Sequence, residues 1–169
     1  MLISSTDQET YMRQALQQAE TALQAGDLPI GAVIVHGGEV VARGRNHYYT
    51  GHVLRHAETE AILQVPRRFD RKRDNAAIFT TAEPCYMCYG AILLAGITHV
   101  YYAAPDAHFG ASQIHGQGHY EQGRIHTWQG GVLERESFRL MLRYSERFCR
   151  LHFGERFDEI LGTIEGPIS

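Results

Sequence analysis

The sequence lacks several features that mark whole classes of protein. Three cysteines among 169 residues are an odd number and too few for a disulfide framework, so a reducing compartment is expected. No run of about 18 apolar residues occurs, which predicts no membrane-spanning helix and no membrane partner. Residues 1–9 have no positive segment followed by an apolar stretch, so no secretory signal is expected and a cytoplasmic location is the default.

Positive charge is also scarce, because the net charge is -3 at neutral pH. Wrapping a nucleic-acid backbone requires clustered lysine and arginine, so this balance argues against it. The exception is a basic run that is interrupted by Phe69 and Asp70, and a solvated loop is favoured there over an RNA contact. Its members are Arg67, Arg68, Arg71, Lys72 and Arg73.

Neither a repeat nor a low-complexity linker divides the chain, which predicts one domain over residues 1–169. Apolar spacing and turn residues predict helices that alternate with strands after an initial hairpin, an α/β layered domain. The glycine-rich segment 110–123 is expected to be a loop that faces a substrate or is simply mobile. The expected helices are 6–25 (from a capping box Thr6-x-x-Glu9), 56–64 (ended by Pro66), 85–95 and 133–153; the expected strands are 32–35, 40–42, 76–80, 100–104 and 125–128.

Two short motifs, His56-Ala57-Glu58 and Pro84-Cys85-Tyr86-Met87-Cys88, carry the chemistry. Cysteines three residues apart at a helix start lie on one face and can share one metal. Two thiolates and an imidazole supply three of zinc's four tetrahedral positions, and catalytic zinc sites leave the fourth for water. Glu58 lies two positions beyond His56, where a carboxylate can exchange protons with that water without ligating the metal.

Other interpretations fit these motifs less well. A redox Cys-x-x-Cys pair does not require an upstream His-x-Glu, and a four-cysteine structural zinc site is excluded because only Cys149 remains. Six further histidines lie in or near loops, where solvated or substrate-contacting roles are favoured over a second metal. They are His47, His52, His108, His115, His119 and His126.

The motifs taken together resemble the cytidine deaminase-like superfamily, and within it the branch of nucleobase and tRNA adenosine deaminases. The matching segments are 28–33, 44–46, 56–61 and 80–92. The resemblance implies a three-layer α-β-α fold with a central mixed five-stranded sheet, one Zn²⁺ per subunit and a homodimer. It makes His56, Cys85 and Cys88 the metal ligands and Glu58 the proton shuttle.

The resemblance also implies substrate contacts. Asn46 matches the base-binding asparagine, whose amide can both donate and accept a hydrogen bond. Backbone groups of Ala57 and Glu83 would contact the departing amino group and the ring. The tRNA adenosine deaminases share an acidic residue near Asp106 but tend to be basic, and the loop 104–109 has no lysine or arginine.

The segment 153–160 resembles the aromatic, acidic end of fungal-type cytosine deaminases, where a final helix closes over the pocket. By position Glu159 would bind the free base, and Phe157 or Phe153 would be part of the lid, so residues 154–169 form a tail or lid. The alternative is an amphipathic tail that caps the dimer. We therefore expect deamination of a small nucleobase or nucleoside, with cytosine-type substrates slightly ahead of purines. The alternatives are a tRNA-specific adenosine-to-inosine deaminase and a non-catalytic zinc-binding module.

Overall fold

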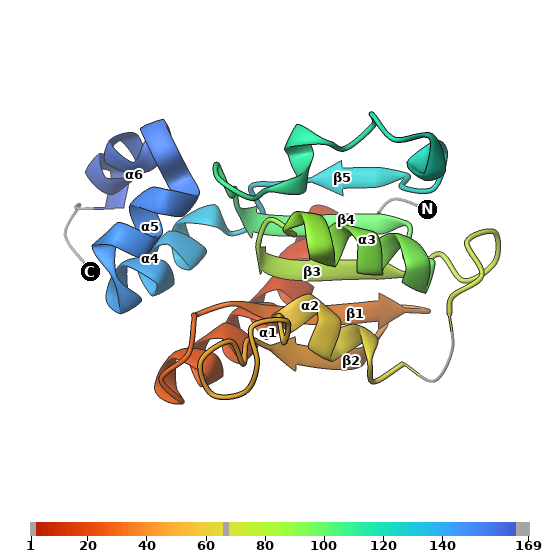
Figure 1. Ribbon diagram of the computed structural model, residues 1–169, viewed down its shortest axis with the longest axis horizontal. Helices are drawn as coiled ribbons and strands as arrows, with labels where there is room; N and C mark the ends of the chain where they lie inside the picture. The colour runs from red at the N-terminus through yellow and green to blue at the C-terminus, as the bar shows by residue number, and fades with distance from the viewer. Residues whose placement is uncertain (1–2, 66–67, 165–169) are drawn as a thin grey trace.

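The computed structural model describes residues 3–65 and 68–164 and contains a five-stranded mixed sheet (Figure 1). The strands β1 (Gly31–His36), β2 (Glu39–Arg45), β3 (Ala77–Ala82), β4 (His99–Ala104) and β5 (Thr127–Gln129) lie in the order β2-β1-β3-β4-β5. β1 is antiparallel to β2 and β3, whereas β3, β4 and β5 run parallel. The mixed five-stranded sheet expected from the resemblance is confirmed.

The hairpin of β1 and β2 turns at Gly37 and Gly38, whose φ angles are +62° and +84°. Two successive residues with positive φ match the tight hairpin turn that follows the twist of the strands, and glycine adopts this conformation without steric cost. The hairpin predicted from the two apolar runs is therefore confirmed. On the other side of β1 the sheet continues with β3, β4 and β5.

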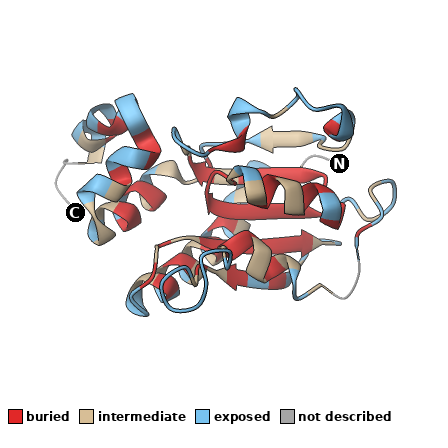
Figure 2. Ribbon diagram, viewed as in Figure 1, coloured by how far each residue is buried: buried red, intermediate tan, exposed pale blue. Residues whose placement is uncertain are grey.

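Alternate residues of the central strands face two helical layers. Val33 and Phe79 pack with Met12 and Ala15 of α1 (Ser5–Gln24) on one face. On the other face Ile34 and Ile78 pack against α2 (Ala57–Ile62) and α3 (Tyr86–Ala95). Side chains along a strand alternate between faces, so a strand covered on both sides is buried throughout, as β3 is in Figure 2. The predicted three-layer α-β-α arrangement is confirmed.

The long helix expected over 133–153 is wrong, because the chain breaks at Ser145. The structure has α4 (Glu134–Tyr144) and α5 (Glu146–Phe153), followed by α6 (Phe157–Ile164). Ser145 is extended (φ −168°, ψ 128°), and its hydroxyl accepts a hydrogen bond from the Phe148 amide at 3.3 Å. Serine at this position satisfies an otherwise unpaired amide of the next helix, so it starts α5 in a new direction. These three helices lie together at one end of the sheet (Figure 1).

The start of α1 also differs from expectation. Ser4, not Thr6, precedes the helix, and its hydroxyl accepts from the Asp7 amide at 3.2 Å. Gly26 follows the helix with φ +80°, as the predicted C-terminal cap requires. Segment 110–123 contains two short 3-10 turns. Pro66, which was expected to end the second helix, lies outside the described residues, as do Met1, Leu2, Arg67 and residues 165–169 of the tail.

None of the helices within 3–65 and 68–164 is long and apolar enough to cross a membrane.

Candidate metal and catalytic site

The predicted ligands meet where two helices begin side by side. His56 precedes α2, Cys85 precedes α3, and Cys88 lies in the first turn of α3. The His56 Nδ1 atom lies 3.6 Å from the Cys85 Sγ and 3.5 Å from the Cys88 Sγ. Tetrahedral zinc with ordinary Zn–S and Zn–N bonds separates sulfur and nitrogen ligands by about 3.6 Å. The three side chains thus fit one zinc ion, and all their ligand atoms lie within 4.8 Å of one another.

The two thiols differ in their ionisation. Hydrogen bonding from Cys88, followed by the contact with His56, lowers the pKa of Cys85 to about 4 despite partial burial. The contact with Cys85, together with burial, raises the pKa of Cys88 well above its ordinary value. Thiol ligands bind metal as thiolates, so metal binding would release the proton of Cys88. The resulting donor set of two thiolates and one imidazole suits a zinc site.

Glu58 lies beside these ligands without belonging to the group. Its carboxylate is 3 % exposed. Its Oε1 accepts from the Thr80 hydroxyl at 3.1 Å, and its Oε2 lies 3.4 Å from the Cys88 Sγ. Burial raises the pKa of the Glu58 carboxyl, and negative charge on Cys85 adds to that shift. A buried carboxyl beside a metal site, with its pKa raised in this way, is suited to proton transfer.

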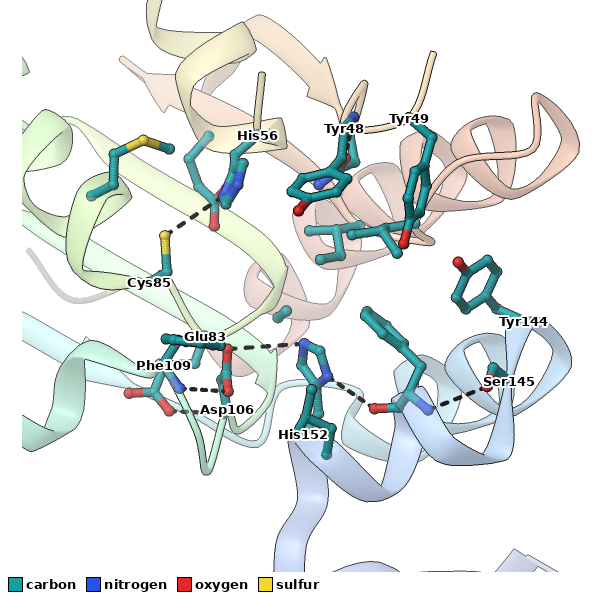
Figure 3. A pocket seen from close by; sticks show the side chains of 18 of the residues that line it. Tyr48, Tyr49, His56, Glu83, Cys85, Asp106, Phe109, Tyr144, Ser145 and His152 are labelled. Carbon is teal, nitrogen blue, oxygen red and sulfur yellow. Dashed lines mark hydrogen bonds and ion pairs between the residues drawn. The ribbon is translucent and has the colours of Figure 1, made fainter. Parts of the chain in front are cut away.

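A pocket of about 920 Å³ opens at this site. Figure 3 shows His56 and Cys85 on one side of it and His152 facing them across the cavity. Of the predicted substrate contacts, Asn46, Glu83 and Asp106 line the pocket. Ala57 is fully buried and is not among the lining side chains, so its proposed backbone contact stays a prediction.

Asn46 is oriented by the backbone that follows it. The side chain is 1 % exposed, and its Oδ1 accepts a hydrogen bond from the Tyr48 amide at 2.8 Å. Because the amide oxygen is used in this way, the Nδ2 group is the one left to contact a ligand. Asn46 can therefore serve a substrate as a donor, rather than as the donor and acceptor that its chemistry alone allows.

The loop that carries Tyr48 and Tyr49 is held by a buried carboxylate that sequence reasoning missed. Asp27 is fully buried and accepts hydrogen bonds from the amides of Tyr48, Tyr49 and Thr50 at 3.1, 3.1 and 2.9 Å. Burial alone would raise the pKa of Asp27, but hydrogen bonds from Thr50, Leu28 and Tyr49 outweigh it and lower the pKa. This carboxylate fixes both tyrosines at the rim of the pocket.

Glu83 and Asp106 shape the opposite rim. The Glu83 carboxylate accepts from the amides of Asp106 at 3.0 Å and Ser112 at 2.6 Å. The Asp106 Oδ1 accepts from the amides of His108 and Phe109 at 3.0 and 2.9 Å. Both side chains thus fold the loop after β4, and the Asp106 Oδ2 remains on the pocket side, 3.9 Å from the His152 Nε2.

The C-terminal residues predicted to form a lid do not line the pocket. Phe157 is 1 % exposed and packs on Phe138 with 5.2 Å between ring centroids, while Glu159 is exposed. The break at Ser145 explains the difference: α5 turns toward the pocket and α6 packs behind it. Phe153 is likewise buried in this cluster.

Side chains of α5 form the far wall instead, and none of them was predicted. His152 is 6 % exposed, and its Nδ1 donates to the Phe148 carbonyl at 3.1 Å. Burial lowers the pKa of His152, and the nearby Asp106 carboxylate only partly opposes that shift. Neutral His152 therefore presents its Nε2 to the pocket as an acceptor. The sequence signal for this wall was Ser145, a typical helix N-cap within the expected long helix.

A family model described as the cytidine and deoxycytidylate deaminase zinc-binding region matches residues 5–104, which include His56, Glu58, Cys85 and Cys88. With the fold and the His-Cys-Cys site, this match defines a zinc-dependent hydrolytic deaminase, an enzyme that acts on a carbon–nitrogen bond. The match spans more than half of the 169 residues, and the chain belongs to this cytidine and deoxycytidylate deaminase family.

Several curated relatives are named for one substrate. A tRNA-specific adenosine deaminase of Streptococcus pyogenes serotype M18 is 41% identical over 111 residues, which cover 64% of this chain and 70% of the relative. One of Bacillus subtilis is 37% identical over 109 residues, covering 63% and 68%. The tRNA-specific adenosine deaminase 2 of Xenopus tropicalis is 37% identical over 110 residues, covering 60% and 65%. The chain thus spans slightly less than two thirds of some of these relatives.

Solved structures agree with the fold. One from a study of A-to-I editing by tRNA:A34 deaminases is 30% identical with a TM-score of 0.63, covering 78% of this chain and 98% of that one. A guanine deaminase from Nitrosomonas europaea is 22% identical with a TM-score of 0.66, covering 80% and 83%. Because the guanine deaminase is only 22% identical, its similarity to this chain shows the fold alone.

Proposed function

We propose that this chain deaminates adenosine to inosine within a tRNA. The observation that carries the proposal is its 37–42% identity to curated relatives named tRNA-specific adenosine deaminase. These comparisons favour the RNA alternative over the small free base that the acidic tail suggested.

The pocket supports a base that is attached to a strand. None of the described tail residues, 154–164, lines the pocket, so this part of the tail does not close it. Three aromatic side chains at its edge are well exposed: Tyr48 (36 %), Tyr49 (63 %) and Phe109 (54 %). Exposed aromatic rings are the platforms on which unstacked RNA bases lie. A large open pocket with such a rim suits a flipped nucleotide and its neighbours.

A cation at the same rim fits a phosphate. Arg147 of α5 lines the pocket, is exposed and makes no ion pair within the described residues. Its neighbour Arg150, by contrast, pairs with Glu146 and Asp158. An unpaired guanidinium beside aromatic rings can contact the backbone of a bound strand. The overall charge of -3 is thus compatible with local RNA contacts.

The chemistry follows from the buried carboxylate. Zinc, when bound, lowers the pKa of water to about 7 and so makes a nucleophile available at neutral pH. Glu58 takes a proton from the attacking water and delivers it to the amino group on C6 of adenine. The C6–O bond forms, the C6–N bond breaks, and ammonia leaves with inosine as the product. Asn46 donates its Nδ2 hydrogen bond to a ring nitrogen and so positions the base.

Ammonia release from a substrate panel tests the proposal. The panel contains an anticodon stem-loop with adenosine, the same stem-loop with guanosine in its place, and free cytosine, adenine, guanine and their nucleosides. We expect turnover of the adenosine stem-loop only. Turnover of a free base or nucleoside without turnover of the RNA would overturn the RNA proposal in favour of a small substrate. A complete absence of turnover in zinc-loaded protein would instead indicate a non-catalytic zinc-binding module.

We also propose that the protein works as a homodimer in the cytoplasm. The location follows from the proposed tRNA substrate. The dimer is implied by the family resemblance and is supported by large apolar side chains that are exposed at the end of α2 and on α3, those of Leu63 and Leu94.

A further inference from the structure

A second cavity, of about 960 Å³, lies far from the catalytic pocket. Its walls come from the loop 68–75 between α2 and β3 and from segment 122–126 before β5. Both segments lie at the end of the sheet opposite α5 (Figure 1). None of the residues of the catalytic site lines this cavity. Half of its lining residues, 68–72, belong to the basic run of the sequence.

The lining of this cavity is strongly positive. It contains four cationic side chains and a single carboxylate, that of Asp70. The Asp70 carboxylate is engaged with its own loop, because Oδ1 accepts from the Lys72 amide at 2.9 Å and Oδ2 lies 3.8 Å from the Arg73 Nε. The positive charge is therefore concentrated in a protein whose net charge is -3. The four cations are Arg68, Arg71, Lys72 and Arg124.

Arg71 carries a polar group that lacks an acceptor. Its guanidinium is anchored by a hydrogen bond from Nη2 to the Leu93 carbonyl at 2.8 Å. Its Nε is buried and has no hydrogen-bond partner among residues 3–65 and 68–164. Leaving a buried donor unpaired is destabilising, and more so when the group is charged. The guanidinium nevertheless keeps its positive charge at the wall of the cavity, where an anion is attracted to it.

Two further donors are fixed in position. The Oδ1 of Asn75 accepts from the His99 Nε2 at 2.6 Å, which leaves the Nδ2 group to donate. Asn75 has a positive φ of 46°, a conformation in which asparagine is tolerated better than most residues. The Arg124 guanidinium stacks 4.1 Å from the centroid of the Tyr120 ring, which orients it without neutralising its charge.

We propose that this cavity binds a phosphate group. Guanidinium, ammonium and amide donors line this cavity, and its one carboxylate, that of Asp70, is engaged with its own loop. Such donors match the oxygens of a phosphate, which arginine binds through paired hydrogen bonds. The phosphate belongs either to a small phosphorylated molecule or to the backbone of a bound RNA. The inference does not rest on the proposed tRNA activity, because binding is measured without turnover.

Titration calorimetry with inorganic phosphate and with AMP tests this site. The zinc-loaded native protein is compared with Lys72→Glu and with Arg139→Glu, a matched charge reversal on the exposed side of α4. Loss of one charged hydrogen bond corresponds to about a tenfold rise in Kd. We expect at least that rise for Lys72→Glu and less than a twofold change for Arg139→Glu, with equal melting temperatures. Arg71→Lys, which keeps the charge but loses the planar guanidinium, should also weaken binding.

The affinity for an anticodon stem-loop at several salt concentrations identifies the source of the phosphate. If Lys72→Glu weakens RNA binding and lowers the slope of log K against log salt by about 1, the cavity binds RNA backbone. If it weakens binding of phosphate and AMP only, the cavity binds a small phosphorylated molecule. The proposal is wrong if Lys72→Glu changes none of these affinities, or changes them no more than Arg139→Glu does.

Discussion

At the scale of single residues, Glu58 is both buried and placed beside the metal ligands. One oxygen of its carboxylate lies beside the Cys88 sulfur, and the other accepts a hydrogen bond from the Thr80 hydroxyl. The Thr80 contact orients the carboxylate, and burial raises the pKa of the carboxyl. Because it is not a ligand, it can change protonation without disturbing the metal.

Replacing Glu58 should separate metal binding from catalysis. Glu58→Gln keeps the shape and the acceptor for Thr80 but cannot take a proton, so turnover should fall by about 10²–10⁴-fold. Zinc content, measured by atomic emission, should remain at one ion per chain. Glu60→Gln is the matched control, because Glu60 pairs with Arg55 and should leave turnover unchanged. Turnover of Glu58→Gln within tenfold of native would contradict the assigned role.

Asn46 allows a test of the direction of its hydrogen bond. Asn46→Asp keeps an acceptor for the Tyr48 amide but replaces the Nδ2 donor with a second acceptor oxygen, which carries negative charge when the carboxyl is ionised. Loss of the hydrogen bond from Nδ2 to the base should lower kcat/KM by about ten- to a hundredfold. Steady-state kinetics on the stem-loop substrate provides the measurement, and an unchanged melting temperature shows that the loop survives. An unchanged kcat/KM would mean that Asn46 is only a turn residue.

The residues that could be predicted from sequence share one property: their geometry is local. His56, Cys85 and Cys88 meet because each lies at the start of a helix, and Glu58 is only two positions from a ligand. Phe157 and Glu159 were placed by likeness to another protein's tail, although their position depends on the bend at Ser145. Asp27 and His152 were missed because their partners are distant in sequence, and no spacing rule points to them.

At the scale of elements, the strands and the first three helices could be predicted because the apolar period and the glycines agree there, although Ser4 and not Thr6 caps α1. The single long helix was wrong because the apolar pattern continues through Ser145 and conceals the change of direction. Local hydrogen bonding by a serine overrode a periodic signal. This bend decides which side chains reach the pocket.

Capping at Ser145 can be measured. Ser145→Ala removes the hydrogen bond to the Phe148 amide and should lower the free energy of unfolding by about 1 kcal/mol. Ser145→Asp supplies another good cap and should retain most of that stability. Urea denaturation of both variants provides the comparison. Equal losses in the two variants would show that the hydroxyl does not cap α5.

The loop held by Asp27 should respond to acid. The folded pKa of Asp27 is lowered, so its contribution to stability is present above the unfolded carboxyl's pKa of about 3.9 and is lost as pH falls through the folded value. Asp27→Asn should therefore destabilise the protein most at neutral pH and progressively less below about pH 4. Melting temperatures of both proteins from pH 7 to 3 test this. A difference that is constant across that range would contradict the linkage.

At the scale of the whole molecule, the sheet separates two chemically different cavities. One holds the metal ligands and an aromatic rim beside α5, and the other holds four cations at the opposite end. The overall charge of -3 conceals this second, positive region, since net charge reports the sum and not its distribution. The only sequence feature that pointed to it was the basic run, for which a solvated loop was the favoured interpretation.

The face formed by α2 and α3 is the place where the predicted homodimer can be tested. Leu63, which ends α2, is 80 % exposed, and Leu94 of α3 is 64 % exposed, while the two helices lie side by side (Figure 1). Adjacent large apolar side chains on an outer face are typical of a protein–protein contact. Light scattering should give twice the mass of the chain for the native protein, and Leu94→Glu should shift it toward one chain. Val41→Glu, on the edge strand β2 and 44 % exposed, is the matched control and should remain dimeric. A native protein with the mass of one chain would exclude the dimer, and a Leu94→Glu variant that stays dimeric would place the interface elsewhere.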